Sequence, residues 1–332
     1  MKRSVVKLGS SLLLALTSII GAVPLFGAAP SLLFNRLDVS RRLKSFQNTA
    51  RRGRIESAPT LPRPVRFRED EGRGLLVDVW INDTGAYTFA VDTGAGASII
   101  SARVAREVGA KLIAGSSISI GGLSGQTSGG GREAVIRTLA IGERRNYLPA
   151  KGLVIVSEHL PPDVDGVLDP SECYQPHGFV IDFPAREMSA FDPRLTPVRR
   201  DEAPAGGAVV PWLTDGNSRR PFVTLDGGRR ALVDTGSGFG LALNLNHARA
   251  LGMTDLRGRE RVSVHDLARG EVRAERIAPA TVQIGALSLR RVPTDLLLSA
   301  PANVPILLGR DALRPFQLTF DPLHKLICFA PR

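Results

Sequence analysis

From residue 65 to residue 332, short runs in which apolar and polar residues alternate are separated by turns rich in glycine, asparagine and aspartate. Residues 74–81 alternate in this way, Asn82-Asp83-Thr84-Gly85 supplies a turn, and residues 87–91 run on into Asp92. Alternation over about 4–8 residues between such turns is typical of β-strands. The pattern predicts an all-β fold of many short strands with a few short helices.

Two apolar runs end in nearly the same motif. The first leads into Asp92-Thr93-Gly94-Ala95, and the second, 142 residues later, leads into Asp234-Thr235-Gly236-Ser237. Each motif places a carboxylate at the end of a buried strand, where the small residues that follow allow a sharp turn. A third Asp-Thr-Gly, at residues 83–85, follows a polar asparagine and is interpreted as a hairpin turn.

Three further features repeat in the same order after each motif. They are a short helix between a capping residue and a glycine (Ser101 to Gly109, Asn246 to Gly252), a second apolar run (ending at Asp169 and Gly309) and a further strand (179–183 and 316–320). The capping residues and the closing glycines are those expected at helix ends. Four features that occur twice in one order predict an internal duplication into two homologous lobes.

With these motifs, the chain resembles the two-lobed aspartic proteases of the pepsin and retropepsin superfamily, and its lobes resemble bacterial retropepsin-like proteins more than pepsin itself. The resemblance covers residues 65–332 and rests on the two Asp-Thr-Gly motifs and on Leu307-Leu308-Gly309-Arg310-Asp311. It implies two lobes, at residues 65–198 and 205–332, with a catalytic cleft between them. It also implies a monomeric aspartic endopeptidase that acts on polypeptides and needs no cofactor or metal.

The resemblance assigns roles to the residues of both motifs. Asp92 and Asp234 are the expected catalytic pair, which shares one proton and so supplies both an acid and a base. Thr93 and Thr235 are expected to hydrogen-bond across the axis between the lobes. The supporting residues of the loops are Gly94, Gly236 and Ser237, of which the glycines allow the turn and offer backbone N–H groups.

Two positions break the symmetry between the copies. Ser237 has a hydroxyl that can donate to the aspartates, whereas Ala95 has none, so we expect Asp92 to carry the shared proton more often. Asp169 stands where the family usually has a glycine, as at Gly309. The extra carboxylate predicts an altered pH optimum, a shifted loop or a lobe that has lost activity.

A glycine-rich stretch at residues 118–131 lies where the family has a hairpin flap that closes over the substrate. Gly121, Gly122 and Leu123 are the candidate flap residues, and a mobile hairpin there would suit a lid. An ordinary surface loop is the alternative. The stretch contains no tyrosine, so the flap tyrosine of pepsin-like enzymes has no counterpart.

The net charge of +11 arises entirely in residues 1–68, and the rest of the chain is neutral overall. Because the folded part offers no basic stripe, the charge does not favour a nucleic-acid partner. Residues 1–29 combine a basic start with an apolar stretch at 8–29, which predicts a signal peptide or a membrane anchor. Residues 30–64 are expected to be a basic linker or a removable pro-segment.

These N-terminal features favour export to a periplasm or cell envelope, with membrane association through residues 8–29. The orientation stays open, because basic residues after the apolar stretch outnumber those before it. Cys173 and Cys328 would be able to pair in an oxidising compartment. No histidine pair or Cys-x-x-Cys indicates a zinc site.

Other functions find less support in the sequence. Gly94-Ala95-Gly96 and residues 236–240 do not match the nucleotide-binding pattern of spaced glycines before a long helix. The chain has no Gly-x-Ser-x-Gly element of a serine hydrolase. A weak or inactive protease fold that binds peptides or regulates a partner remains the alternative, because of Asp169 and the missing flap tyrosine.

Overall fold

The computed structural model describes residues 60–332 except 71, 150–151, 217, 259 and 266–269, together with the strand at 13–14. The rest of the predicted signal peptide or anchor, and all of the predicted linker before residue 60, lie outside the described residues. Residues 61–332 fall within one compact unit. Within the described part of the chain, no helix is long and apolar enough to cross a membrane.

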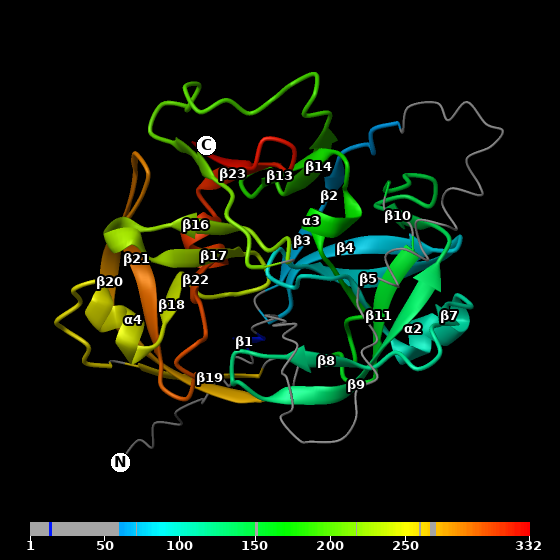
Figure 1. Ribbon diagram of the computed structural model, residues 1–332, viewed down its shortest axis with the longest axis horizontal. Helices are drawn as coiled ribbons and strands as arrows, with labels where there is room; N and C mark the ends of the chain where they lie inside the picture. The colour runs from blue at the N-terminus through cyan, green and yellow to red at the C-terminus, as the bar shows by residue number, and fades with distance from the viewer. Residues whose placement is uncertain are drawn as a thin grey trace, which may run out of the picture. The chain divides into compact units, whose positions relative to one another are not determined.

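The first half of the folded region forms a ten-stranded sheet (Figure 1). Its main path runs in the order β10 (Leu139–Ile141), β4 (Gly74–Ile81), β5 (Thr84–Val91), β12 (Gly166–Leu168), β6 (Ile99–Ser101), β11 (Gly152–Ser157), β9 (Thr127–Ile136) and β7 (Lys111–Leu112). Off this path, β3 (Arg68–Asp70) pairs with β4, and β8 (Ile118–Gly121) pairs with β9. The turn at residues 82–85 joins β4 to β5, which confirms its interpretation as a hairpin turn.

The second half repeats the central part of this order, written below from the opposite end, in an eight-stranded sheet that also includes β1 from the N-terminal segment. The order is β1 (Leu13–Leu14), β19 (Glu260–His265), β20 (Glu271–Ile284), β21 (Leu287–Leu297), β18 (Leu241–Leu243), β22 (Ile306–Gly309), β17 (Arg230–Asp234) and β16 (Phe222–Thr224). In each half, the strand that leads into Asp-Thr-Gly pairs in parallel with the second apolar run, which pairs on its other side with an antiparallel strand. The shared topology confirms the predicted two-lobed all-β fold.

A third sheet joins the halves (Figure 1). Its six strands run in the order β15 (Ala208–Pro211), β24 (Leu326–Pro331), β23 (Phe316–Asp321), β13 (Gly178–Asp182), β14 (Glu187–Phe191) and β2 (Val65–Arg66). The two strands predicted at equivalent positions, β13 and β23, pair with each other in antiparallel register. Phe179 and Phe320 face each other there with ring centroids 4.5 Å apart. The duplicated strands therefore meet at the symmetry axis.

The helices are short, as the pattern predicts. In the described part of the chain they are α2 (Ala102–Glu107), α3 (Pro170–Cys173), α4 (Leu245–Ala250), α5 (Arg310–Leu313) and the 3₁₀ helix η1 (Asp226–Gly228). Ser101 caps α2 as predicted, since its hydroxyl accepts a hydrogen bond from the Val104 N–H. The predicted cap Asn246 is wrong, because β18 ends at Leu243 and α4 begins directly after it. Asn244 is the cap, and its side chain accepts from the His247 N–H at 3.0 Å.

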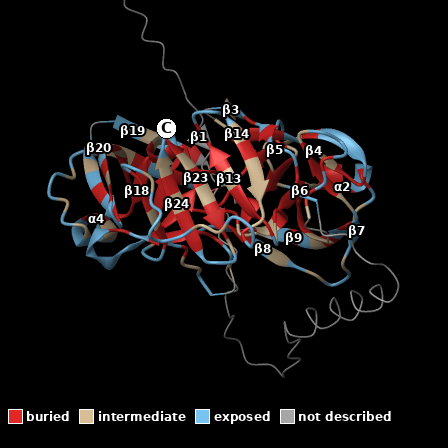
Figure 2. Cartoon of the chain, turned by 90° about the horizontal axis from the view of Figure 1, so that it is seen from above, coloured by how far each residue is buried: buried red, intermediate tan, exposed pale blue. Residues whose placement is uncertain are grey.

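Buried residues follow the strands of both halves, and exposed residues gather in the loops and hairpin ends (Figure 2). The largest apolar cluster takes members from both halves, including Val91 and Val233, which precede the two aspartates. Apolar side chains buried from water supply most of the stabilisation of such a core. The strand ends that carry Asp92 and Asp234 are therefore anchored in the most deeply buried part of the molecule.

Candidate active site

Asp92 and Asp234 occupy equivalent places at the ends of two buried strands. Asp92 follows β5, and its backbone N–H donates to the Leu168 carbonyl of β12 at 2.9 Å. Asp234 is the last residue of β17 and lies opposite Gly309 of β22. Both aspartates are fully buried. A parallel neighbour therefore holds each strand end in place, so each carboxyl group is presented at a fixed point.

The threonines of the two motifs hold the halves together through reciprocal hydrogen bonds. The Thr93 hydroxyl donates to the Val233 carbonyl at 2.6 Å, and the Thr235 hydroxyl donates to the Val91 carbonyl at 3.1 Å. Each hydroxyl also accepts from the backbone N–H of the other threonine at 3.1 Å. Buried hydrogen bonds of this kind are costly to break, so the two loops are fixed relative to each other.

Each motif glycine lies directly against the carboxyl group of the opposite half. A Cβ atom on Gly94 would lie 2.9 Å from Cγ of Asp234, and one on Gly236 would lie 2.4 Å from Cγ of Asp92. Both distances are shorter than van der Waals contact, so no side chain fits at either position. Glycine is required at both positions because a side chain would clash with the opposite carboxyl group, and not because the backbone is unusual. The same contacts show that Asp92 and Asp234 lie in one site.

Burial and the neighbouring charge raise the pKa of Asp92 well above its usual range. Burial is the largest cause, the Asp234 carboxylate is the second, and the Gly94 N–H opposes both by donating to Asp92 Oδ1 at 2.7 Å. Asp92 Oδ2 is buried, and a side-chain hydrogen bond with Asp234 also raises the pKa of Asp92. Asp234 Oδ1 accepts from the N–H groups of Gly236 and Ser237, at 2.9 and 3.1 Å. These contacts favour a proton on Asp92 and a negative charge on Asp234.

Comparison with protein families matches each half separately. Residues 77–168 match the aspartyl protease family, and residues 226–315 match the putative aspartyl protease of gag polyproteins. The chain carries two retropepsin-like aspartyl protease lobes. Comparison with curated proteins gives no match. Each family match includes one of the two Asp-Thr-Gly motifs, so the aspartates that the structure brings together come one from each protease lobe.

Asp169, the departure from the family pattern, caps helix α3 of the first lobe. Its Oδ1 accepts from the Ser171 N–H at 2.9 Å and from the Ser171 hydroxyl at 2.6 Å. Burial, followed by the nearby Glu172 carboxylate, raises the pKa of Asp169 to about 7. Asp169 also contributes to the raised pKa of Asp92. The β5–β12 pairing continues to Leu168, so this extra carboxylate does not disrupt the strands behind Asp92.

The second lobe has no room for such a side chain at Gly309. A Cβ atom there would lie 2.3 Å from the Phe239 carbonyl oxygen and 2.8 Å from that of Ser237. Support comes instead from Arg310, whose Nη1 donates to the carbonyls of Thr235 and Gly236 at 3.1 and 3.0 Å. The motif around Arg310 contributed to the resemblance, but the sequence indicated no role for this side chain.

The predicted flap is a hairpin formed by β8 and β9. The Gly122 N–H donates to the Gln126 carbonyl at 3.1 Å, and this bond closes the turn next to Gly121. Leu123 is fully buried in an apolar cluster with side chains of the second lobe, namely Phe222, Leu232, Phe239, Ala242, Val264, Val272, Ala274, Leu297, Val304 and Leu307. The tip of the hairpin therefore packs on the opposite lobe, a contact that the sequence pattern did not predict.

Ser237 contacts Asp234 through its backbone, since its N–H donates to Asp234 Oδ1. Its hydroxyl accepts from the Phe239 N–H at 3.4 Å, and donation from the hydroxyl to the aspartates remains a prediction. Cys173 is buried and Cys328 is partly buried, and both are free thiols. Within the described residues, no cluster of three or more histidine, cysteine, aspartate or glutamate side chains is arranged to hold a metal ion.

Proposed function

We propose that the protein is an aspartic endopeptidase in which Asp92 and Asp234 activate water to cleave a peptide bond. The observation that carries the proposal is the reciprocal fit of the two motifs, in which each glycine lies under the opposite carboxyl group. The raised pKa of Asp92 supports the division of roles, with Asp92 as the acid and ionised Asp234 as the base.

The reaction needs only these two carboxyl groups and one water molecule. The water oxygen bonds to the carbonyl carbon of the peptide while Asp234 takes a proton from that water. At the same time, Asp92 gives its proton to the carbonyl oxygen. The tetrahedral intermediate then breaks its C–N bond while Asp234 returns the proton to the leaving nitrogen. A hydroxyl proton of the intermediate passes to Asp92, which restores the starting state. Because both loops are fixed by the threonine bonds, the pair needs little reorganisation between steps.

The test is incubation of the full chain with an unstructured protein across a range of pH, with cleavage sites identified by mass spectrometry. Asp92→Asn and Asp234→Asn should each lower kcat/KM by roughly 1,000-fold, because each removes one partner in proton transfer. An inhibitor that mimics the tetrahedral intermediate should block cleavage by the unchanged chain. Cleavage that survives both substitutions would disprove the proposed mechanism.

A second candidate is a protein that binds peptides in this fold without turning them over. The buried Asp169 motivates it, because an additional carboxylate next to Asp92 can hold both aspartates protonated. Binding of the same substrate protein by the unchanged chain, with no cleavage at any pH, would favour this candidate over the endopeptidase.

We also propose that the protein is exported to a periplasm or cell envelope, either by a cleaved signal or by a retained anchor in residues 8–29. The basic start followed by an apolar stretch supports the proposal. Cell fractionation with N-terminal sequencing tests it. An intact Met1 on a protein found entirely in the cytosol would contradict both forms.

A further inference from the structure

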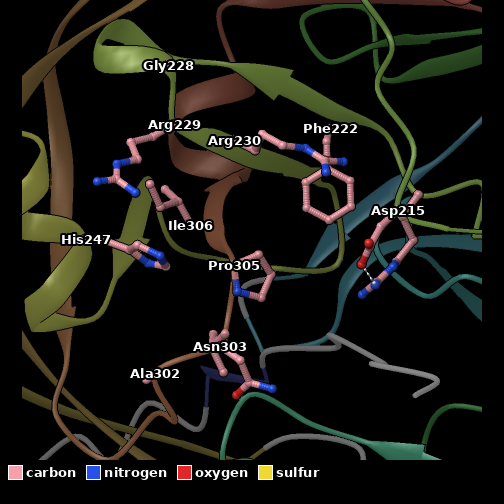
Figure 3. A pocket seen from close by; sticks show the side chains of 12 residues that line it. Asp215, Phe222, Gly228, Arg229, Arg230, His247, Ala302, Asn303, Pro305 and Ile306 are labelled. Carbon is pink, nitrogen blue, oxygen red and sulfur yellow. Dashed lines mark hydrogen bonds and ion pairs between the residues drawn. The ribbon is translucent and has the colours of Figure 1, made fainter. Parts of the chain in front are cut away.

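A cavity of about 460 Å³ lies in the second lobe, beside the residues that precede β22 (Figure 3). The segment before β16 forms one wall, the end of η1 and the start of β17 form another, and α4 and residues 302–306 complete it. None of its lining residues belongs to the Asp-Thr-Gly motifs. We call this cavity the arginine pocket.

The arginine pocket carries an excess of positive charge. Arg220, Arg229 and Arg230 line it, whereas Asp215 is its one lining carboxylate, so two positive charges remain uncompensated. His247 also lines the pocket, but burial, with the nearby Arg229 as a second cause, lowers its pKa and favours its neutral form. The guanidinium groups stay charged at any working pH, so the pocket attracts anions.

Arg220 is the most deeply buried cation of the arginine pocket, with 6% of its surface exposed. Its Nε donates to the Ser218 hydroxyl at 3.2 Å, and its Nη2 donates to Asp215 Oδ2 at 3.3 Å. Its Nη1 is buried and has no acceptor among the described residues. Because this nitrogen has no accessible surface, Arg220 contributes positive charge to the pocket, and the exposed Arg229 and Arg230 offer the N–H donors that a ligand can reach.

Arg230 and Phe222 stack on each other and form one side of the pocket. The Arg230 guanidinium lies over the Phe222 ring, with Cζ 4.7 Å from the ring centroid, and its Nη2 donates to the Thr214 carbonyl at 2.9 Å. The stacked guanidinium keeps further N–H groups for a ligand, because five donors are available and one is used by Thr214. Arg229 is exposed at the edge of the pocket.

The arginine pocket adjoins the candidate active site. A Cβ atom on Gly96, four residues after Asp92, would lie 3.5 Å from Cγ and Cδ of Arg220. Phe222 and Val304 line the pocket and also belong to the cluster that buries the flap residue Leu123. A polypeptide lying over the two aspartates would therefore pass close enough for a neighbouring side chain to enter the pocket.

We propose that the arginine pocket is a substrate subsite that takes a carboxylate, supplied by an Asp or Glu side chain away from the scissile bond. The inference rests on the proposed function and gives it a substrate class, namely acidic polypeptides. Arginine matches carboxylates because its planar N–H pairs bind both oxygens. Asp215, whose side chain is 59% exposed, is the internal carboxylate that the ligand would join or displace.

The test measures binding and cleavage separately. The full chain carrying both Asp92→Asn and Asp234→Asn is titrated with fluorescent peptides in which Glu is scanned through each position, each matched by a Gln peptide. One position should bind at least about tenfold more tightly with Glu, which corresponds to about 1.4 kcal/mol. Adding Arg229→Gln and Arg230→Gln should abolish that preference, whereas Arg144→Gln, an exposed arginine of the first lobe, should leave it unchanged.

Equal binding of the Glu and Gln peptides at every position would overturn the inference, as would a preference that survives Arg229→Gln with Arg230→Gln. Peptides with a free or an amidated C-terminus separate a side-chain carboxylate from a terminal one, and a preference that requires the free terminus would refute the side-chain assignment. If the acidic peptides bind through these arginines but the unchanged chain cleaves none, the subsite stands and the proposed endopeptidase fails.

Discussion

The loops that carry Asp92 and Asp234 follow the same backbone course but are supported by groups of opposite charge. Behind the first loop lie the buried carboxyl group of Asp169 and the half-buried carboxyl group of Glu172, and Asp169 adds to the raised pKa of Asp92. Behind the second loop lies the buried guanidinium of Arg310. The duplication therefore preserved the geometry of the site and not its electrostatics. Both supports favour a proton on Asp92 and a charge on Asp234.

Apart from substitution of the aspartates themselves, the largest effect is expected where the two loops touch. Gly236→Ala places a methyl group 2.4 Å from Cγ of Asp92, and Gly94→Ala places one 2.9 Å from Cγ of Asp234. Since a displacement of about 1 Å in a catalytic group can cost roughly 100-fold, we expect losses in kcat/KM of this size, greater for Gly236→Ala. Peptide cleavage measured beside circular dichroism checks the result. Full activity in both folded variants would show that the loops move to accommodate the added methyl group.

The support of the first lobe is tested by the pH dependence of stability. The pKa of Asp169 rises from its usual value near 4 to about 7 on folding, so the folded state binds more protons in that window. Stability is then lost as pH rises from about 4 to 7, by about 2–4 kcal/mol for this group. Asp169→Asn keeps the helix cap and removes the titration.

We therefore expect thermal unfolding of Asp169→Asn to depend less on pH, with a higher Tm than the unchanged chain at pH 8. Glu172, whose pKa burial also raises, keeps its own contribution in both proteins. Parallel Tm curves from pH 4 to 8 would show that Asp169 does not titrate in this window.

The support of the second lobe is tested at Arg310. Arg310→Gln withdraws the donor from the carbonyls of Thr235 and Gly236, which are left buried, so we expect a loss of about 1–3 kcal/mol in unfolding free energy. Arg314→Gln is the matched control on the next turn, where half-exposed ion pairs contribute about 1 kcal/mol or less. Urea unfolding measures both. Equal losses would show that the carbonyl contacts contribute nothing specific.

The smallest effect is expected at the position where the motifs themselves differ. Ser237→Ala removes the hydroxyl from the second loop, and Ala95→Ser adds one to the first. If the hydroxyl biases the shared proton, each change should move the pH–rate profile by about half a pH unit or less, since it alters one hydrogen bond near the pair. Profiles that coincide with that of the unchanged chain would show that the hydroxyl does not influence the shared proton.

The sequence predicted the strands, the duplication and the two motifs because each rests on a local pattern. Alternation and turn residues identify strands, and Asp-Thr-Gly after an apolar run identifies the loops. The cap at Asn244 was missed because its helix follows β18 without a linker, so the pattern placed the start two residues late. The two Asp-Thr-Gly motifs do meet, since their positions in the two halves are equivalent.

What the sequence could not predict depends on contacts between distant segments. Arg310 appears in a motif, but only the fold shows that its guanidinium reaches the carbonyls of the second loop. Asp169 appeared as a departure from a pattern, and its role as a helix cap depends on where α3 begins. Arg220 gave no signal at all, because an arginine in a charged segment is usually exposed and this one is buried.

The pairing of β13 with β23 has a consequence for the integrity of the molecule. Each half contributes three neighbouring strands to one continuous sheet, so neither half can leave without exposing a hydrogen-bonding edge and the stacked phenylalanine rings. A proteolytic cut in the long connection at residues 192–207 would leave two fragments that are still joined by the β13–β23 pairing. Separation of the fragments would dismantle the sheet and the pair of aspartates in the same event.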